Sequence, residues 1–352
     1  MSATPDARLL VGLPAGSLAD PSRGGNLTDL LKHAGFPTRG YEQGGPSSFP
    51  MTSFLVGWDG RPQEFGAQLG LGEIDVAIAG DDWVRERVLE FRFEYKQEIQ
   101  IERVLPLRRG NVSIVIINNA KGDDRASDEW LRELLAEKPL VTMVSEMPYL
   151  ALDWFQGKVK ALGFEKTHGA FSVQKFKTPP RIESGIVIYE TWGKTEAKVK
   201  HGSVDLGLEI SQTGSAIQNY GLNVVDEVMT SEAGIWVNPE VRRDPAKYDL
   251  ARMFLLNVYG AVFAENKVLV FFNAKKEDVP RVLEYLKENK LFADEPTMNE
   301  GLNFTEFSVQ MDTRNTELPL AKARYELAKL GATHIETTPL ESCIPGLDAI
   351  NF

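Results

Sequence analysis

Residues 205–222 carry the residue types in this chain best suited to binding a phosphorylated sugar. Their sequence, DLGLEISQTGSAIQNYGL, predicts a buried strand that delivers Glu209 at its end, then a polar loop and a helix from about Ala216. Backbone N–H groups at the start of a helix bind phosphate together with nearby hydroxyls, and Gly214 would let the backbone approach the ligand closely. The positions expected to hold the phosphate are Ser211, Gln212, Thr213, Gly214, Ser215 and Ala216.

The same pattern also has an explanation that needs no ligand. Thr213 or Ser215 could be the N-cap of the helix and accept its first N–H groups. A carboxylate such as Glu209, just before the loop, could hold sugar hydroxyls or a Mg²⁺ ion. The segment by itself leaves both interpretations open.

Short apolar strands alternate with helices through the first two thirds of the chain, which predicts an α/β fold with mostly parallel sheets. The sequence GEIDVAI at 72–78 recurs in pattern as GSVDLGL at 202–208. This repeat suggests two similar lobes facing each other across a cleft, although it could also be a common way to begin a strand. In such folds ligands bind at the carboxyl ends of the strands.

The last part of the chain has a different pattern. Strands are expected at 267–273, 303–312 and 332–339, with helices between them, which is the order of a small ferredoxin-like module. We therefore expect three domains. The first lobe takes residues 1–100 with a return segment at 225–264, the second lobe takes 101–224 with the phosphate loop, and the C-terminal domain takes 265–352.

Bulk composition limits the function classes. The 352 residues are enough for two or three domains, and the formal net charge of -11 argues against a nucleic-acid-binding surface. The one cysteine, Cys343, rules out an intrachain disulfide and a cysteine-based metal site, and the four histidines have no ligand spacing. The sequence has no signal peptide and no run of membrane-spanning length, so a soluble cytoplasmic protein is expected, with no membrane partner.

Several motifs, in the same order along the chain, resemble those of the ATP phosphoribosyltransferase family in its long form. The family pattern Asp-Ala-Ile-x-Asp, followed by Thr/Ser-Gly-x-Thr-Leu and Asn-Gly-Leu, is similar to residues 205–222 here. Glu196 stands where the family has Gly-x-Val-Glu. The other similar segments are RPQEF at 61–65, GEIDVAIAGDD at 72–82, VSEMPYL at 144–150 and LGATHIETTPLE at 330–341.

The resemblance implies a two-lobed catalytic region of the type II periplasmic-binding-protein kind, followed by an ACT-like regulatory domain. It implies transfer of a phosphoribosyl group from phosphoribosyl pyrophosphate (PRPP) to N1 of the adenine of ATP, with release of pyrophosphate, as the first step of histidine biosynthesis. Mg²⁺ would be the cofactor, histidine a feedback inhibitor, and the assembly a homo-oligomer, either a dimer or a hexamer. The implied catalytic residues are Glu196, Glu209 and Asp205, of which Glu209 and Asp205 would also bind the metal. The implied nucleotide-binding residues are Gly16, Ser17, Arg61, Asp82 and Ser145.

The chain departs from the family pattern at the substrate loops. The family's first loop carries Lys and Arg at positions that are Ala15 and Ser17 here, and the closing Thr of the phosphate loop is Ala216. A triphosphate needs charge compensation in a cleft, so the acceptor could differ from ATP. One alternative is the same chemistry in a specialised purine-antibiotic pathway of the pentostatin or coformycin type, or on another purine nucleotide. The other is a two-lobed small-molecule-binding protein without catalysis.

Overall fold

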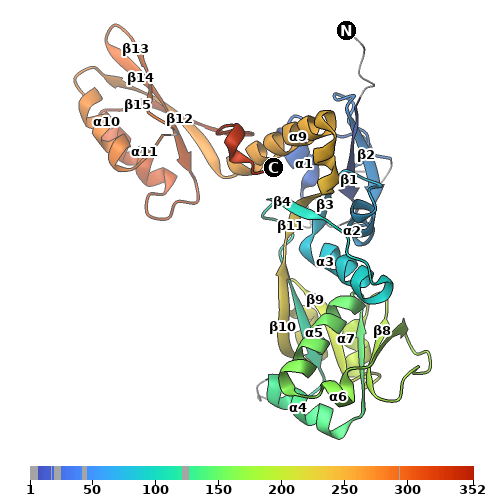
Figure 1. Cartoon of the computed structure of the whole chain (residues 1–352). Coiled ribbons are helices and arrows are strands. Elements are labelled where there is room, and N and C mark those ends of the chain that lie inside the picture. Colours follow the sequence, from blue (N-terminus) through green and yellow to red (C-terminus); the bar gives the residue numbers. More distant parts are fainter. Residues whose placement is uncertain (1–6, 17, 20–24, 42–45, 121–126, 293) are drawn as a thin grey trace. The chain divides into compact units, whose positions relative to one another are not determined.

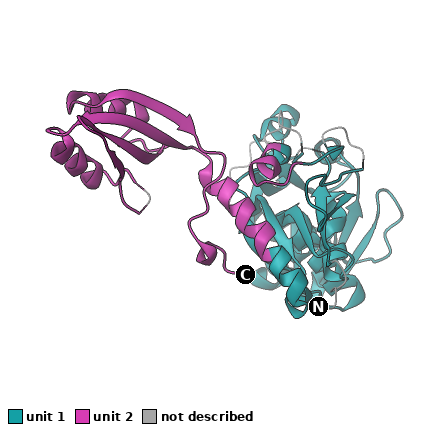
Figure 2. Ribbon diagram, turned by 90° about the horizontal axis from the view of Figure 1, so that it is seen from above, with its two compact units in different colours: residues 1–28, 38–251 teal, residues 29–37, 252–352 magenta. Residues whose placement is uncertain are grey.

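The computed structural model describes residues 7–16, 18–19, 25–41, 46–120, 127–292 and 294–352 (Figure 1). The chain divides into two compact units (Figure 2). Unit 1 comprises residues 1–28 and 38–251, and unit 2 comprises residues 29–37 and 252–352. Unit 1 contains two α/β lobes, each with its own sheet, and is the part that positions the candidate site.

The first lobe is built on a five-stranded sheet in the order β2-β1-β3-β11-β4. β1 is parallel to β2 and β3, whereas β11 is antiparallel to β3 and β4. Phe65 and Leu69 of α2 pack with Ile74 and Val84 in its core. The elements are β1 (Leu9–Pro14), α1 (Leu27–His33), β2 (Leu55–Gly60), α2 (Pro62–Gly70), β3 (Val76–Gly80), α3 (Asp81–Glu90), the π-helical turn η3 (Phe91–Tyr95), β4 (Glu102–Pro106) and β11 (Ala233–Val237).

The second lobe has a six-stranded sheet in the order β10-β5-β9-β6-β8-β7. Neighbouring side chains of a strand point to opposite faces, so Ile114 and Ile116 pack against α5, whereas Val115 and Ile117 pack on the side of α7 and α8. The elements are β5 (Val112–Asn118), α4 (Ser127–Glu137), β6 (Leu140–Ser145), α5 (Pro148–Leu162), α6 (Glu165–His168), β7 (Phe171–Lys175), β8 (Gly185–Glu190), α7 (Thr195–Lys200), β9 (Leu206–Ser211), α8 (Ser215–Tyr220) and β10 (Asn223–Ser231).

The chain passes between the two lobes at two places. The first lies between β4 and β5, and the second lies at Glu232, the residue that separates β10 from β11. The lobes were expected to meet after residues 100 and 224, but β4 pairs with β11 in the first sheet and β10 pairs with β5 in the second. The crossings therefore fall a few residues later than expected, because the pairing partner of a strand decides its sheet and is not visible in its own sequence.

Unit 2 contains a four-stranded sheet in the order β13-β14-β12-β15. Val282 and Leu286 of α10 and Leu327 of α11 pack with Phe272 and Phe307 of the strands, so both helices belong to one core. The order β12-α10-β14-α11-β15 agrees with the ferredoxin-like expectation, and β13 is an added strand beside β14. The elements are β12 (Lys267–Lys275), α10 (Val279–Glu288), β13 (Thr297–Glu300), β14 (Phe304–Asp312), α11 (Leu320–Lys329), β15 (Thr333–Pro339) and η5 (Leu347–Ala349).

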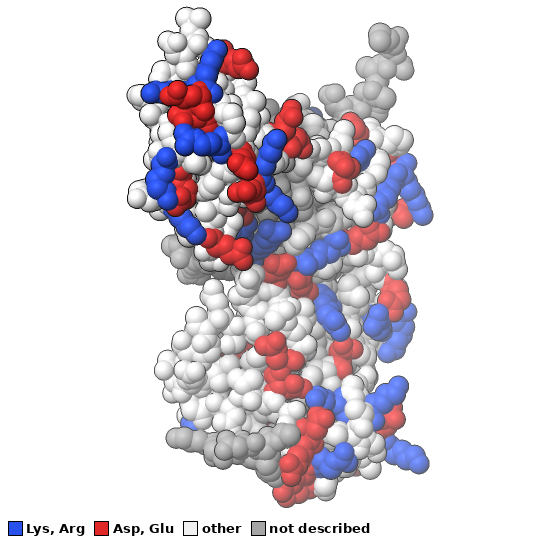
Figure 3. Space-filling model, turned by 90° about the vertical axis from the view of Figure 1, so that its left-hand side faces the viewer, with Lys and Arg blue, Asp and Glu red and all other residues white. Residues whose placement is uncertain are grey.

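The segment between β11 of the first lobe and this sheet is helical. It consists of η4 (Pro239–Arg243) and the 20-residue helix α9 (Pro245–Ala264). No helix among the described residues is long and apolar enough to cross a membrane. Acidic and basic side chains are interspersed over the face shown in Figure 3, as suits a chain with 50 Asp and Glu and 39 Lys and Arg residues.

Candidate active site

The loop between β9 and α8 has the geometry of an anion-binding turn. Gly214 adopts a left-handed conformation with φ of +72° and is the N-cap of α8, so no side chain occupies the cap position. The hydroxyls of Thr213 and Ser215 lie 2.8 Å apart, and the Ser215 N–H donates weakly to Thr213 Oγ1 at 3.4 Å. A Cβ on Gly214 would have no neighbour nearer than 4.0 Å. The loop is therefore open, with hydroxyl and N–H groups available to a ligand.

Three carboxylates gather beside this loop. Burial first, and then the charge of Glu196, raises the pKa of Glu209 to about 7, while Thr195 donates a hydrogen bond to it. Glu146, at the end of β6, raises the same pKa further. The structure thus brings together two of the carboxylates expected from the sequence, Glu196 and Glu209, and adds a third that was not expected.

Asp205 lies elsewhere. Its carboxylate accepts hydrogen bonds from the N–H group of Thr142 at 2.9 Å and from the Thr142 hydroxyl at 2.8 Å, and it pairs with Lys138. Asp205 directly precedes β9, and Glu209 lies four residues further along, a span of about 13 Å in an extended strand. The expected catalytic and metal-binding role of Asp205 does not fit this arrangement. The side chain instead ties the start of β9 to β6.

Asp82 and Ser145, two of the expected nucleotide-binding residues, have side chains occupied by internal bonds. Asp82 is 4% exposed, its carboxylate accepts the Trp83 N–H at 2.9 Å, and burial raises its pKa. Ser145 is fully buried, and its hydroxyl accepts the Met147 N–H at 2.8 Å. The residues next to them line pockets instead: Asp81, beside Asp82, lines one pocket, and Glu146, beside Ser145, lines another.

The remaining expected nucleotide positions belong to the first lobe. Gly16 follows β1 with φ of +89°, and Ser17 lies outside the described residues. Arg61 is exposed, precedes α2 directly and forms no side-chain cap to it. Gly16 and Arg61 therefore follow the carboxyl ends of the parallel strands β1 and β2, where ligands bind in such sheets.

A pocket of about 550 Å³ lies where the two lobes meet. It is large enough for a nucleotide-sized ligand. Asp81 and Arg103 of the first lobe contribute to it together with Gln212 of the phosphate loop and Glu232 of the crossing. Arg103 pairs with Asp81 at 3.0 Å and with Glu232 at 2.7 Å. Sequence reasoning missed Arg103 because it stands within a strand and belongs to no motif.

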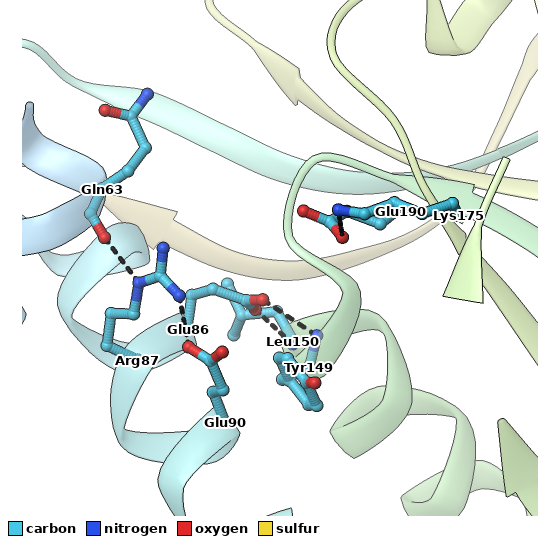
Figure 4. Close-up of polar contacts among 8 residues, drawn as sticks. All are labelled: Gln63, Glu86, Arg87, Glu90, Tyr149, Leu150, Lys175 and Glu190. Carbon is cyan, nitrogen blue, oxygen red and sulfur yellow. Dashed lines mark hydrogen bonds and ion pairs between the residues drawn. The ribbon is translucent and has the colours of Figure 1, made fainter. Parts of the chain in front are cut away.

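A smaller pocket of about 70 Å³ lies between α3 and the start of α5. Beside it, the carboxylate of Glu86 accepts the N–H groups of Tyr149 at 3.0 Å and Leu150 at 2.7 Å (Figure 4). A carboxylate from one lobe thus caps a helix of the other. Burial raises the pKa of Glu86 to about 8 despite these donors. Also lining the pocket are Trp83, Glu90, Glu146, Glu190 and Trp192.

The donor set beside the phosphate loop suits a metal ion only in part. Within the described part of the chain, no group of three or more His, Cys, Asp or Glu side chains is arranged to hold a metal. Mg²⁺ in phosphate-transfer sites commonly takes one or two carboxylates, with substrate phosphates and water as its other ligands. Glu209 and Glu196 fit that partial role, because the repulsion between their charges would be relieved by a cation.

The fold and the loop together define a two-lobed α/β protein with an open, hydroxyl-rich loop beside a pair of carboxylates. The model of the ATP phosphoribosyltransferase (HisG) family matches residues 61–255, and the chain belongs to this family. The matched range contains Arg61, both carboxylates and the whole phosphate loop, whereas the first strand and its loop lie outside it.

Curated relatives agree with this membership. The chain is 27% identical to the ATP phosphoribosyltransferase of Geotalea uraniireducens (strain Rf4) over 349 residues, covering 96% of this chain and 99% of that one. It is 28% identical to ATP phosphoribosyltransferase 1 of Geobacter sulfurreducens over 351 residues, covering 95% and 98%. It resembles a structure of the ATP phosphoribosyl transferase (HisG:HisZ) complex from Thermotoga maritima with a TM-score of 0.50, 16% identity and coverage of 72% and 98%. That likeness confirms the fold.

Proposed function

We propose that this enzyme transfers the phosphoribosyl group of PRPP to N1 of the adenine of ATP and releases pyrophosphate, which opens histidine biosynthesis. The observation that carries the proposal is the open phosphate loop at 211–216 beside the paired carboxylates of Glu196 and Glu209. The match to the ATP phosphoribosyltransferase family over residues 61–255 supports PRPP and ATP as the substrates.

In the proposed reaction the bond between the anomeric carbon and the pyrophosphate oxygen breaks, and a bond from that carbon to adenine N1 forms. The transition state carries positive charge on the ribose ring. The loop hydroxyls and N–H groups hold the 5-phosphate, which fixes the ribose for attack. Ionised Glu209 holds ribose hydroxyls and stabilises the positive ring, with Glu196 beside it.

Mg²⁺ would enter with PRPP and offset the charge of the departing pyrophosphate. Glu209 and Glu196 are the residues placed to contact it, and Asp205 is left out because its carboxylate is bound to Thr142 and Lys138. Glu209 must be ionised for this role, and because its pKa is raised to about 7, a cation held beside it would favour its ionised form.

The acceptor end of the site belongs to the first lobe. Gly16 and Arg61 follow the carboxyl ends of β1 and β2, and Arg61 is a cation suited to phosphate. The first loop carries Ala15 and Ser17 instead of basic residues, and this favours the second candidate, the same transfer to another purine nucleotide in a specialised pathway. ATP, ADP, AMP and inosine triphosphate offered in parallel separate the two candidates.

The remaining parts of the proposal concern assembly and regulation. We propose that the ferredoxin-like unit 2 binds histidine as a feedback inhibitor and joins copies of the chain into a dimer or hexamer in the cytoplasm. Isothermal titration of histidine checks the first part, and a flat trace contradicts it. Light scattering of the purified protein checks the second.

The main test measures pyrophosphate release with ATP, PRPP and Mg²⁺ present together and with each omitted in turn. Release that needs all three supports the proposal. Binding of PRPP or ATP without any release would identify a two-lobed binding protein instead.

A further inference from the structure

The pocket of about 550 Å³ is continuous with the phosphate loop through Gln212. Asp81, at the start of α3 in the first lobe, and Glu232, at the crossing between β10 and β11, both line it. Ser113 and Thr230 of the second lobe add hydroxyl groups to its lining. Because it adjoins the loop proposed to hold PRPP, a ligand in it would lie beside the ribose.

Among the described residues that line this pocket, Arg103 is the one Lys or Arg. Its Nε pairs with Asp81 at 3.0 Å and its Nη2 pairs with Glu232 at 2.7 Å. Within the described part of the chain, Nη1 has no hydrogen bond or ion pair. The side chain is 32% exposed, so the guanidinium can reach a ligand without moving through the core.

The neighbouring strand leaves room for this side chain. A Cβ on Gly234 of β11 would lie 2.8 Å from Arg103 Nε, closer than real Cβ atoms approach other atoms. Glycine at this position therefore lets the guanidinium lie against β11 and reach both carboxylates. The position of the Arg103 side chain thus depends on the glycine backbone of Gly234 as well as on its two ion pairs.

The charges around Arg103 are not balanced. Two carboxylates hold one guanidinium, and burial raises the pKa of Asp81 even though Arg103 opposes the shift. One phosphate can accept two parallel N–H···O bonds from a guanidinium, whereas here each carboxylate pairs with a different nitrogen. When the guanidinium turns to phosphate, Asp81 and Glu232 are left to face the Mg²⁺ that accompanies a nucleoside triphosphate in solution.

We propose that this pocket takes the phosphate chain of the acceptor nucleotide and that Arg103 is the cation that selects it. The inference rests on the proposed function and names the residue that supplies charge where the first loop has Ala15 and Ser17. Asp81 and Glu232 hold the guanidinium in place until phosphate binds it. Glu232 is the more exposed of the two, with 29% of its side chain exposed against 19% for Asp81.

The experiment is calorimetric titration of Mg·ATP and, separately, of Mg·PRPP into the wild-type chain and four variants. Arg103→Gln is expected to weaken ATP binding about tenfold or more and to leave PRPP affinity within about twofold. Arg103→Lys keeps the charge and is expected to retain an intermediate ATP affinity. Arg92→Gln is the matched control, because Arg92 pairs with Glu98 outside the pocket, and it is expected to change neither affinity.

Glu232→Gln separates a binding role from a structural one. It frees the guanidinium from one carboxylate, so ATP should bind more tightly than to the wild-type chain. Unchanged ATP affinity in Arg103→Gln overturns the inference. The inference is also overturned if Arg103→Gln and Glu232→Gln each lower the affinities for ATP and PRPP equally. That result would mean that the ion pairs only support the fold.

These results are independent of turnover. Detection of the phosphoribosyl product with no effect of Arg103→Gln on ATP binding would retain the proposed function and reject this inference. Dependence of ATP binding on Arg103 without any product would reject the proposed function and retain the nucleotide site.

Discussion

The carboxylates of Glu209 in β9 and Glu196 at the start of α7 come together beside the phosphate loop, although separate elements carry them. Burial, and then the Glu196 charge, raises the pKa of Glu209 to about 7. Burial and a neighbouring like charge commonly raise the pKa of carboxylates in active sites. Such a carboxylate is stabilised in its ionised form when a cation or a developing positive charge comes beside it. The relationship makes the activity dependent on pH in a definite direction.

Glu196→Gln is expected to shift the pH dependence of kcat/KM for PRPP. In the proposed mechanism only ionised Glu209 binds the ribose and Mg²⁺, so kcat/KM is expected to rise as the pH increases through about 7. Without the neighbouring charge the pKa of Glu209 falls, and the midpoint of this rise moves to lower pH even if the maximal rate is reduced. A pH profile of both proteins provides the measurement. An unmoved midpoint would show that the two carboxylates do not interact.

Gly214→Ala is expected to lower PRPP affinity by about tenfold or more, because the added methyl group fills the open loop. Gly221→Ala is the matched control, since Gly221 is also left-handed, with φ of +62°, and caps the other end of α8. Both substitutions carry a similar backbone strain of about 1 kcal/mol. Titration of PRPP compares the two, and equal losses of affinity would mean that strain and not the loop surface is responsible.

Asp205→Asn is expected to lower stability by about 1 to 2 kcal/mol while PRPP affinity stays within about twofold. The reason is that Asp205 bonds to Thr142 and Lys138, about 13 Å from Glu209 along β9. Glu209→Gln is expected to do the reverse, with PRPP binding lost and little effect on folding. Urea unfolding and PRPP titration of both variants test the pair. If Asp205→Asn weakened PRPP binding as strongly as Glu209→Gln, the carboxylate would belong to the active site after all.

Glu86 is expected to make unfolding dependent on pH. Its folded pKa of about 8 is above the ordinary value near 4.5. Between these values the unfolded chain is ionised and the folded one holds a proton, so stability falls as the pH rises from about 4.5 to 8. Glu86→Gln resembles the protonated acid and removes this dependence.

Urea unfolding at pH 5 and pH 8.5 provides the measurement for Glu86. The stability of the wild-type chain relative to Glu86→Gln should fall by more than about 1 kcal/mol between the two pH values. A constant difference would show that the N–H groups of Tyr149 and Leu150 keep Glu86 ionised throughout.

The fold was largely predictable because strand and helix periodicities are local. The apolar residues of β9 and Gly214, the N-cap of α8, predict the strand, loop and helix that the structure has at 206–220, and the C-terminal β-α-β-α-β order follows from the same kind of signal. The lobe crossings were not predictable to the residue. The sheet to which β4 belongs is decided by its pairing with β11, and that of β10 by its pairing with β5. Both partners lie far away in the sequence.

The site was predictable where one segment carries it and not where several elements converge. Glu209 and the loop belong to one strand-loop-helix unit, so their proximity follows from sequence. Asp205 shares that segment, but a strand is too extended for both carboxylates to reach one ligand. Among residues that the sequence did not single out, Glu146 stands one position beyond Ser145, and Arg103 becomes visible only when the cleft is assembled.

The most direct test of the central claim is mass spectrometry of the product formed from ATP, PRPP and Mg²⁺. The account predicts a single new nucleotide, ATP with an added phosphoribosyl group on adenine N1, formed in equal amount to pyrophosphate and absent with Glu209→Gln. Intact ATP and PRPP after prolonged incubation with the folded wild-type chain would contradict it.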